Sequence, residues 1–506
     1  MDGVDLEVHE PRGLLFCQYH LPMSAQAQVN RFGRSGGANK GHFKEAWSVK
    51  KSADFAEDIK RQIAHAFENN IPCDLSGVVF PGPIDFSSNE MPSISFADCH
   101  FAGPITVFDG LNFKNADVSF RSAQFTGGSA SFVATAFSGG TANFEDTKFT
   151  GGAVNFARAQ FSGGEANFNK TDFSGGDAVF RSAQFSGGGA YFQRALFSGG
   201  HAHFDGAEFS GGSADFEGAE FPGHVADFQN AKFSGAYVSF RDAKFFDAVA
   251  FFAGAEFSDT VYFDRSSAPS ADGQTSNTFR SAHFHDATFN ADVWFNNQSF
   301  LCKTSFDDTT FGRAPEFHGC ALHQDTTFPP LENFKDTQTE RAAHAYRTLR
   351  LAMKQQEAHE EEAMFWALEQ RSKRNNLDLK KPKNWLPWAL SWGYDLLSNY
   401  GLNAGLPVRW LGGWVVYSTV IYACAAGSLE KLAGVNHWLG ALGFSIAQMA
   451  RPFFIWGDYD GTDIKAALGS NEFSFLIKML ATVDSIVSLT LVALFILAVR
   501  RRFRMQ

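Results

Sequence analysis

The stretch ANFNKTDFSGGD at positions 166–177 decides the fold, because close variants of it recur along much of the chain. Phe recurs from Phe120 to Phe257 in steps that alternate between five and seven residues, which gives a 12-residue period. An Ala usually stands two residues before each Phe, so both side chains point to the same side of an extended segment. A Gly-Gly pair in each period would break a helix at a cost of ~1 kcal/mol per Gly. The period therefore predicts short strands and tight turns wound into a β-solenoid.

The inward Phe side chains should stack along the axis of this solenoid, because each coil buries its residues only against its neighbours. The outward positions are polar and variable, as expected of a solvated face. The solenoid core is predicted to include Phe144, Phe149, Phe156, Phe161, Phe168, Phe173, Phe180 and Phe185.

Tandem A-(D/N)-F units, such as 142–144 (ANF) and 226–228 (ADF), resemble the pentapeptide-repeat family. The resemblance implies an all-β, right-handed quadrilateral β-helix with four five-residue faces in each coil. This chain departs from the family by adding a Gly-Gly corner to every second unit, so we expect coils of ~24 residues rather than ~20. The match is strong over Phe120–Phe257 and looser over Phe80–Phe113 and Phe263–Phe328. The insert Ser266–Asn277 is expected to loop out.

Both ends of a solenoid need caps. A helix over Ser52–Asn69 is a suitable N-terminal cap, since Phe55, Ile59, Ile63 and Phe67 have helical spacing and Ser52 is a good N-cap residue. We divide the chain into an N-terminal region with this helix (1–70), the β-helix (71–330), a helical linker with a basic end (331–384) and a membrane domain (385–506).

Composition excludes several classes of protein. The net charge of −11 gives no basic footprint for nucleic acid. Six Cys without C-x-x-C spacing argue against a zinc ribbon or a disulfide scaffold and favour a reducing compartment. The first residues lack a basic region followed by an apolar stretch, so we expect no signal peptide and a cytoplasmic N-terminal domain.

The segment Glu340–Arg374 is rich in Ala, Glu, Arg, Gln and Lys, and predicts one long helix or a helical hairpin with His359–Glu362 at the bend or on an exposed face. A basic run follows, and then a segment dense in aromatics, Trp385–Tyr394. Alone, such a run indicates a solvated surface. Next to these aromatics it indicates an amphipathic segment at the inner leaflet. The membrane-surface basic residues are predicted to be Arg371, Lys373, Arg374, Lys380, Lys381 and Lys383.

Two stretches are predicted to cross the membrane. Trp410–Leu429 has no charge over about 20 residues, enough for a hydrocarbon core of ~30 Å. Met479–Val499 is a second span, interrupted only by Asp484 and followed at once by Arg500 and further arginines. With Arg409 before the first span, the positive-inside rule places both ends of the chain in the cytoplasm of a bacterial inner (plasma) membrane.

Between the spans, Trp438–Ala450 is apolar but too short to cross, which suits a re-entrant or interfacial segment over about 438–457. This order of segments resembles the pore module of two-transmembrane potassium channels. The best register for a filter keeps only its last two positions, Gly457 and Asp458. Ile455 stands where the filter needs a flexible Gly, so a potassium-selective filter is not expected. The resemblance leaves a degenerate pore, for another ion or for none.

Asp484 is the most informative single residue, because a charge inside a span needs a partner or water. It either lines a pore or pairs across subunits, or else reaches the outer interface near Lys478. Arg451 has the same ambiguity, between a pore and the membrane interface.

No nucleophile, metalloprotease or phosphate-binding motif is present in the sequence. The pairs His201/His203 and His283/His285 could bind a metal on strands but are more often surface residues. We therefore expect no enzyme, no cofactor and no metal.

Three functions remain open. The first is a membrane-anchored scaffold or interaction module at the cytoplasmic face, with membrane lipid and a protein on the solenoid as partners. The second is a subunit of a homo-oligomeric, channel-like pore with a cytoplasmic β-helix. The third is a nucleic-acid mimic that binds type II topoisomerases, as some soluble pentapeptide-repeat proteins do. Fold alone does not choose between them.

Overall fold

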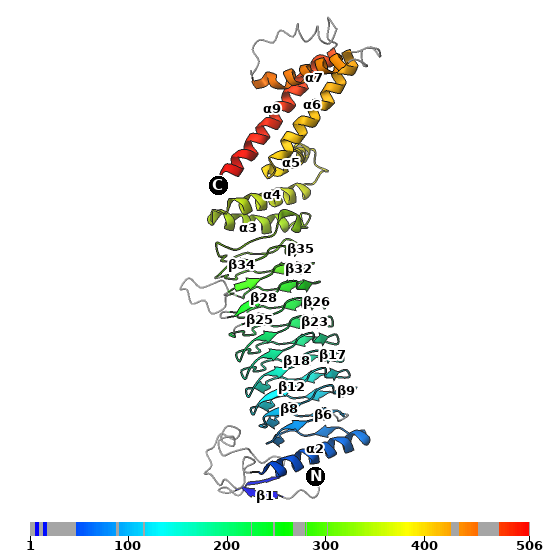
Figure 1. Ribbon diagram of the computed structural model, residues 1–506, viewed down its shortest axis with the longest axis vertical. Coiled ribbons are helices and arrows are strands. Elements are labelled where there is room, and N and C mark those ends of the chain that lie inside the picture. Colours follow the sequence, from blue (N-terminus) through cyan, green and yellow to red (C-terminus); the bar gives the residue numbers. More distant parts are fainter. Residues whose placement is uncertain are drawn as a thin grey trace. The chain divides into compact units, whose positions relative to one another are not determined.

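The computed structural model describes residues 6–9, 14–17, 47–87, 91–114, 117–223, 225–245, 248–266, 279, 281–300, 302–426, 435–453 and 475–504. The chain divides into two compact units, Met1–Asp336 and Thr337–Gln506. The first unit contains a parallel β-solenoid of about nine coils, and the second is helical (Figure 1). The prediction of a β-solenoid followed by helices is confirmed.

One coil shows how the solenoid is built. It passes through β14 (Ala142–Asn143), β15 (Lys148–Phe149), β16 (Val154–Asn155) and β17 (Gln160–Phe161) before β18 (Ala166–Asn167) stacks on β14. Each strand pairs in parallel with the strand one coil later: β13 (Ala136–Phe137) aligns Phe137 with Phe161 of β17, a step of 24 residues. The predicted coil length is therefore correct.

The strands form four faces. Three are continuous sheets: one of ten strands from β3 (Cys73–Asp74) to β33 (Val293–Trp294), another of ten from β5 (Ile84–Asp85) to β34 (Thr304–Ser305), and one of nine from β9 (Asn112–Phe113) to β35 (Thr310–Phe311). The fourth begins with β4 (Val79–Phe80), β7 (His100–Phe101), β11 (Gln124–Phe125) and β15. Single parallel bridges, such as Lys148 to Asp172, continue this fourth face.

Two kinds of corner join the faces. At the first kind, the amide of Thr147 donates to the carbonyl of Phe144 (3.1 Å), and Asp146 between them has a φ of 55°. That geometry is a turn with its third residue left-handed, as in type II. The left-handed position recurs along the solenoid, where Lys170 and Ser182 also adopt it.

The Gly-Gly pairs form the second kind of corner, where successive coils come close together. A Cβ built on Gly163 would lie 2.8 Å from the backbone nitrogen of Gly139 in the preceding coil. Glycine is needed here because of this close approach of backbones, and not because of its own backbone conformation.

The solenoid core consists of columns of Phe. The rings of Phe144, Phe168 and Phe192 stack with centroids 4.8 Å apart, and the neighbouring column meets them edge-on, with Phe180 at 5.4 Å and 87° from Phe168. Such offset and edge-to-face contacts stabilise aromatic cores beyond the burial of area. The eight Phe predicted for the core are all buried.

Helix α2 (Val49–Glu68) lies at the N-terminal end of the described solenoid. Ile59 and Ile63 are fully buried, and Phe55 packs against Phe80 of β4, with ring centroids 6.2 Å apart. The predicted N-cap, Ser52, is wrong: the helix starts one turn earlier and Ser48 Oγ accepts from the amide of Lys51 (3.1 Å).

The first unit also contains elements that do not belong to the sheets of the solenoid. Strands β1 (Leu6–His9) and β2 (Leu14–Cys17) form a separate antiparallel pair. The predicted insert, Ser266–Asn277, lies outside the described residues except for its first position. The unit ends with the 3-10 turn η3 (Leu331–Asn333).

The second unit is helical. Its described helices are α3 (Ala342–Gln355), α4 (His359–Asn375), η4 (Pro382–Asn384), α5 (Trp385–Ser398), η5 (Asn399–Gly401), α6 (Gly405–Ala426), α7 (Val435–Ala450), η7 (Arg451–Phe453) and α9 (Phe475–Arg504). Helices α3 and α4 pack as a hairpin, which resolves the alternative between one long helix and two. Glu357, in the turn between them, is left-handed, with a φ of 59°. Helices α6 and α9 run side by side in opposite directions, and α7 contacts both (Figure 1).

Candidate functional site

Asp484 lies in the middle of the three-helix cluster of α6, α7 and α9. Its side chain is fully buried, and its two carboxylate oxygens accept hydrogen bonds from different donors on α6. Trp414 Nε1 donates to Oδ1 (2.8 Å) and the hydroxyl of Tyr422 donates to Oδ2 (2.7 Å). The carboxylate is therefore satisfied within one chain.

Further polar contacts fix α7 against both neighbours. The hydroxyls of Ser418 on α6 and Ser445 on α7 lie 2.6 Å apart. On α9, Ser485 and Ser488 donate to the carbonyls of Gln448 and Met449 at the end of α7 (2.9 and 2.8 Å). Serine hydroxyls at helix interfaces are typical of helices that pack without a hydrophobic driving force, as in a bilayer.

An aromatic contact closes the same cluster. The ring of Tyr422 meets Phe444 of α7 edge-on, with centroids 4.8 Å apart, and Ala423 and Ala441 fill the space beside them. His437 Nε2 lies 2.9 Å from the carbonyl oxygen of Ala423. The predicted segment Trp438–Ala450 thus belongs to a helix that packs on both long helices.

The remaining pore candidates do not join this cluster in the described structure. Arg451 lies in η7, directly after α7, and its side chain is exposed. Gly457 and Asp458 lie outside the described residues.

Helix α9 has the composition of a membrane span. Its part Met479–Arg500 is the one described helix that is long and apolar enough to cross a membrane, judged by length and composition. Only 22% of its most apolar window is buried, and Ile486 and Ile496 are more than half exposed. A large exposed apolar surface of this kind marks contact with a membrane or a partner.

The other predicted span does not reach the same hydropathy. Helix α6 carries Arg409 near its start and four large aromatic residues, which lower its mean hydropathy. Residues 427–429, at the end of the predicted span, lie outside the described part of the chain. The described structure therefore supports one candidate span where the sequence predicted two.

The predicted basic surface separates into paired and unpaired residues. Arg371 and Arg374, both on α4, hold the carboxylate of Asp395 on α5 at 2.8 and 2.9 Å. Lys373 pairs with the buried Glu369, which also lies 3.1 Å from Arg350. Lys381 pairs with Asp378. Within the described residues, Lys380 and Lys383 form no ion pair, and both are exposed.

A tight elbow joins α5 to α6. Asn399, Tyr400 and Gly401 are all left-handed, with φ values of 50°, 53° and 81°. Tyr400 is buried, packs edge-on against Trp366 of α4 (5.7 Å), and its hydroxyl lies 2.6 Å from that of Ser391. Consecutive left-handed non-glycine residues are costly, so they persist only where the surroundings hold them.

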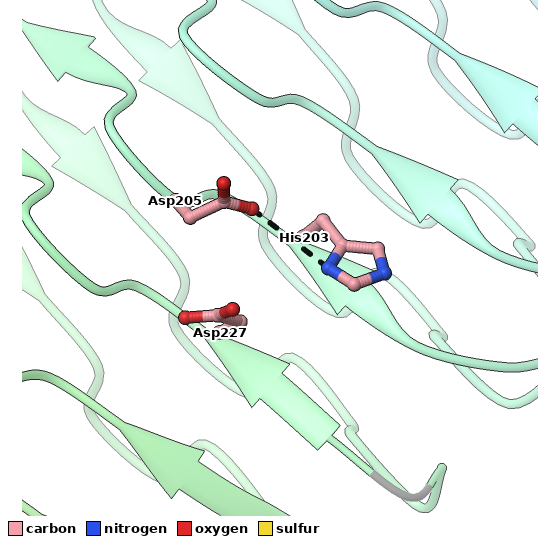
Figure 2. Close-up of side chains that lie close together, drawn as sticks. All are labelled: His203, Asp205 and Asp227. Atoms are coloured by element: carbon pink, nitrogen blue, oxygen red, sulfur yellow. Dashed lines mark ion pairs between the residues drawn. The ribbon is translucent and has the colours of Figure 1, made fainter.

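His203, from the first of the two predicted histidine pairs, lies in a cluster of charged side chains. Figure 2 shows His203 and Asp205 from one coil beside Asp227 from the next. One possible ligand atom of each residue lies within 4.8 Å of those of the other two. Arg181 Nε donates to Asp205 (3.0 Å), and its Nη2 lies 3.2 Å from His203 Nδ1. A guanidinium already fills the place of a cation, so a metal ion would have to displace it. Burial, and then Arg181, lowers the pKa of His203.

The other histidine pair and two cysteines, Cys99 and Cys320, also make contacts within the solenoid. His283 stacks on Phe251 (5.1 Å), and His285 lies among exposed carboxylates. Burial raises the pKa of Cys320 to about 12, and its thiol donates to the carbonyl of Phe295 (3.0 Å). Cys99 makes the same contact with Leu75 (3.0 Å). Thiols held this way are structural and unreactive.

The sequence did not identify the hydrogen-bond partners of Asp484 and Asp395. Trp414 and Tyr422 could have been suspected, because a buried Asp needs donors and α6 offers few others. The contact of Asp395 with Arg371, 24 residues earlier, has no local pattern that predicts it. Comparison of the chain with protein-family models, with curated proteins and with solved structures gives no match.

Proposed function

We propose that this chain is a membrane-anchored scaffold, in which α9 holds a rigid β-solenoid at the cytoplasmic face of a bilayer. One observation carries the proposal: α9 is long, apolar and mostly unburied. A core helix of a soluble protein would bury this surface, whereas a bilayer would cover it.

We propose further that α6 crosses the bilayer beside α9. Trp414 and Tyr422 bind Asp484 from positions eight residues apart on α6, so about two turns of α6 lie beside Asp484, near the start of the apolar segment Met479–Arg500 of α9. Val416 and Val420 on α6 are exposed, as lipid-facing residues would be. Arg409 and Arg500 then stand at the cytoplasmic ends of the two spans, in agreement with the positive-inside rule.

The solenoid supplies the interaction surface of the proposed scaffold. Its four faces, its Ala-x-Phe units and its regular left-handed turns support membership of the pentapeptide-repeat family, with right-handed coils. A stack of about nine coils presents fixed outward columns of side chains, which is how repeat proteins bind partners. The protein partner is proposed to dock on these columns.

The same geometry favours an anchor over a pore. A pore-lining carboxylate should face water or a neighbouring subunit, but Asp484 is fully buried and both its oxygens are occupied by Trp414 and Tyr422. The donors belong to the same chain, so this residue does not need a second copy.

Washing membranes with alkaline carbonate tests the anchor. The full-length protein should stay with the membrane, while Ile486→Arg combined with Ile496→Arg should release it, because each arginine costs about 3 kcal/mol in a span. The matched control is Ile105→Arg, which changes an exposed isoleucine of the solenoid and should leave the protein in the membrane. Extraction of the unchanged protein by carbonate would contradict the proposal.

Reconstitution into liposomes tests the choice between anchor and pore. The purified protein should give no ion flux above that of empty liposomes, and Asp484→Asn should leave this result unchanged. A flux that Asp484→Asn abolishes would instead support the pore.

A further inference from the structure

Helix α5 exposes a continuous apolar face. Five large apolar side chains point outward and are between 41% and 67% exposed. They lie within an arc of about 160° around the helix, given 100° per residue, and a Cβ built on Gly393 in the same arc would meet nothing within 4 Å. This face consists of Trp385, Leu386, Leu390, Trp392 and Leu396, with Ala389 and Gly393 between them.

The one residue of α5 that is charged at neutral pH is turned away from that face. Asp395 is 17% exposed and accepts from both Arg371 and Arg374 of α4, the former through two of its guanidinium nitrogens. Arg371 also donates to Asn399 Oδ1 (2.7 Å) in the elbow. Two arginines therefore hold the inner side of α5, and no charge remains on its outer side.

The ends of α5 are fixed as well. The left-handed elbow Asn399–Gly401 sets the angle at which α5 leads into α6, and the indole of Trp410 on α6 donates to the carbonyl of Leu396 (3.1 Å). At the other end, the indole of Trp385 donates to Leu379 (2.8 Å). Lys380 and Lys383, exposed and without an ion-pair partner among the described residues, directly precede the helix.

We infer that α5 lies in the headgroup–acyl boundary of an anionic bilayer, with its outer face in the lipid and Lys380 and Lys383 among the phosphates. Tryptophan and leucine beside lysine are what such a boundary selects. Helix α5 is joined to α6 by the elbow and contacts both α6 and α9, so the lipid surface that it needs is the one that the proposed anchor already supplies. The inference rests on the proposed function and deepens it by naming a second lipid contact.

The inference also assigns different roles to the lysines and the arginines of the basic run. Lys380 and Lys383 bind lipid headgroups. Arg371 and Arg374 are positioning residues: they neutralise Asp395 and orient α5, and they do not need an anionic lipid.

Photo-crosslinking in proteoliposomes tests the placement of α5. A benzophenone amino acid is introduced into the full-length protein at Leu390 on α5, at Ile486 on α9 as the positive control, and at Leu351 on α3 as the exposed control. Lipid adducts are expected at Leu390 and Ile486 and not at Leu351. Adducts at Ile486 without adducts at Leu390 would overturn the inference alone, while their absence at both would overturn the membrane anchor itself.

Two sets of variants then separate the roles of the basic residues. In vesicles of phosphatidylcholine with phosphatidylglycerol, Lys380→Gln and Lys383→Gln should each lower the Leu390 adduct yield by up to about fivefold, and neither should change it in phosphatidylcholine alone. Arg371→Gln should lower the yield in both kinds of vesicle. If that variant does not fold, Arg371→Lys is used instead, because it keeps the charge but loses the bidentate contact with Asp395. It should also lower the adduct yield in both kinds of vesicle. A loss confined to phosphatidylglycerol for the arginine variants would overturn their positioning role.

Discussion

At the scale of single residues, the buried carboxylate of Asp484 explains how α6 and α9 recognise each other. Its two oxygens need two donors, and Trp414 and Tyr422 provide them from one face of α6. In an apolar environment no water can replace a missing hydrogen-bond partner, so a donor or an acceptor left without its partner is costly. This pairing therefore specifies one register of the two helices.

Replacing Tyr422 with Phe tests that pairing. The ring contact with Phe444 remains, but Asp484 Oδ2 loses its donor, so the protein in detergent should lose about 1 kcal/mol of stability in thermal unfolding. Tyr417→Phe is the matched control, because it removes the same hydroxyl from an exposed position on the same helix. Equal effects of the two substitutions would contradict the assignment.

The two kinds of corner in the solenoid predict opposite tolerance to substitution. Gly163→Ala should destabilise the protein by about 1–3 kcal/mol, because the new Cβ meets the backbone of the preceding coil. Gly206→Asn should cost less than about 1 kcal/mol, since Asn tolerates the left-handed conformation and Asn230, one coil later, already adopts it. Chemical unfolding of both variants measures the difference, and the reverse order would refute this explanation of the corners.

His203 predicts a pH dependence of the solenoid. Its pKa in the folded protein lies below the usual 6.5, so folding favours the neutral ring. Stability should therefore be complete above pH 6.5 and fall as the pH decreases through that value towards the folded pKa. His203→Gln should flatten this part of the profile in urea unfolding, while His285→Gln, which removes an exposed ring, serves as control. An unchanged slope in His203→Gln would contradict the prediction.

At the scale of elements, the sequence offers two starting points for helix α2. Ser48 and Ser52 are both acceptable N-cap residues one turn apart, and only the structure shows that Ser48 is used. Ser48 Oγ accepts a hydrogen bond from the amide of Lys51, which has no acceptor within the helix.

Substitution of the two serines tests the assignment. Ser48→Ala should cost about 1 kcal/mol of stability. Ser52→Ala lies inside the helix, where alanine is the best helix former, and should be neutral or slightly stabilising. A larger loss for Ser52→Ala than for Ser48→Ala in chemical unfolding would restore the sequence-based interpretation.

The elements also show why some features could be predicted from the sequence and others could not. The Phe columns follow from a repeat in which each residue meets its equivalent 24 positions later, so the period alone defines the core and the coil. The clamp of Arg371 and Arg374 on Asp395 spans a similar separation but has no repeat behind it. The sequence therefore predicted Arg371 and Arg374 at the membrane surface and did not indicate that they pair with Asp395. The partners of Asp484 were missed for the same reason, because the pairing of two helices depends on their register.

At the scale of the whole molecule, the chain combines two kinds of structure. The coils of the solenoid bury one another's apolar side chains, whereas the helices leave apolar surface exposed. The solenoid buries its Phe and pairs its strands internally, so its outward columns are available for a partner. Helix α9 has the opposite character, with Ile486, Leu489 and Ile496 exposed. This contrast supports the proposal that the solenoid binds a partner while α9 anchors the chain.

The most direct test of the anchor is the mass of the detergent-solubilised full-length protein, corrected for bound detergent. If α6 and α9 both cross the bilayer as proposed, they can enclose a pore only when several chains form a ring, whereas an anchor whose Asp484 is satisfied within its own chain needs no such ring. We predict a species of one chain, or at most two, that keeps this mass at every protein concentration tested. A stable ring of four or five chains would contradict the anchor and support the pore.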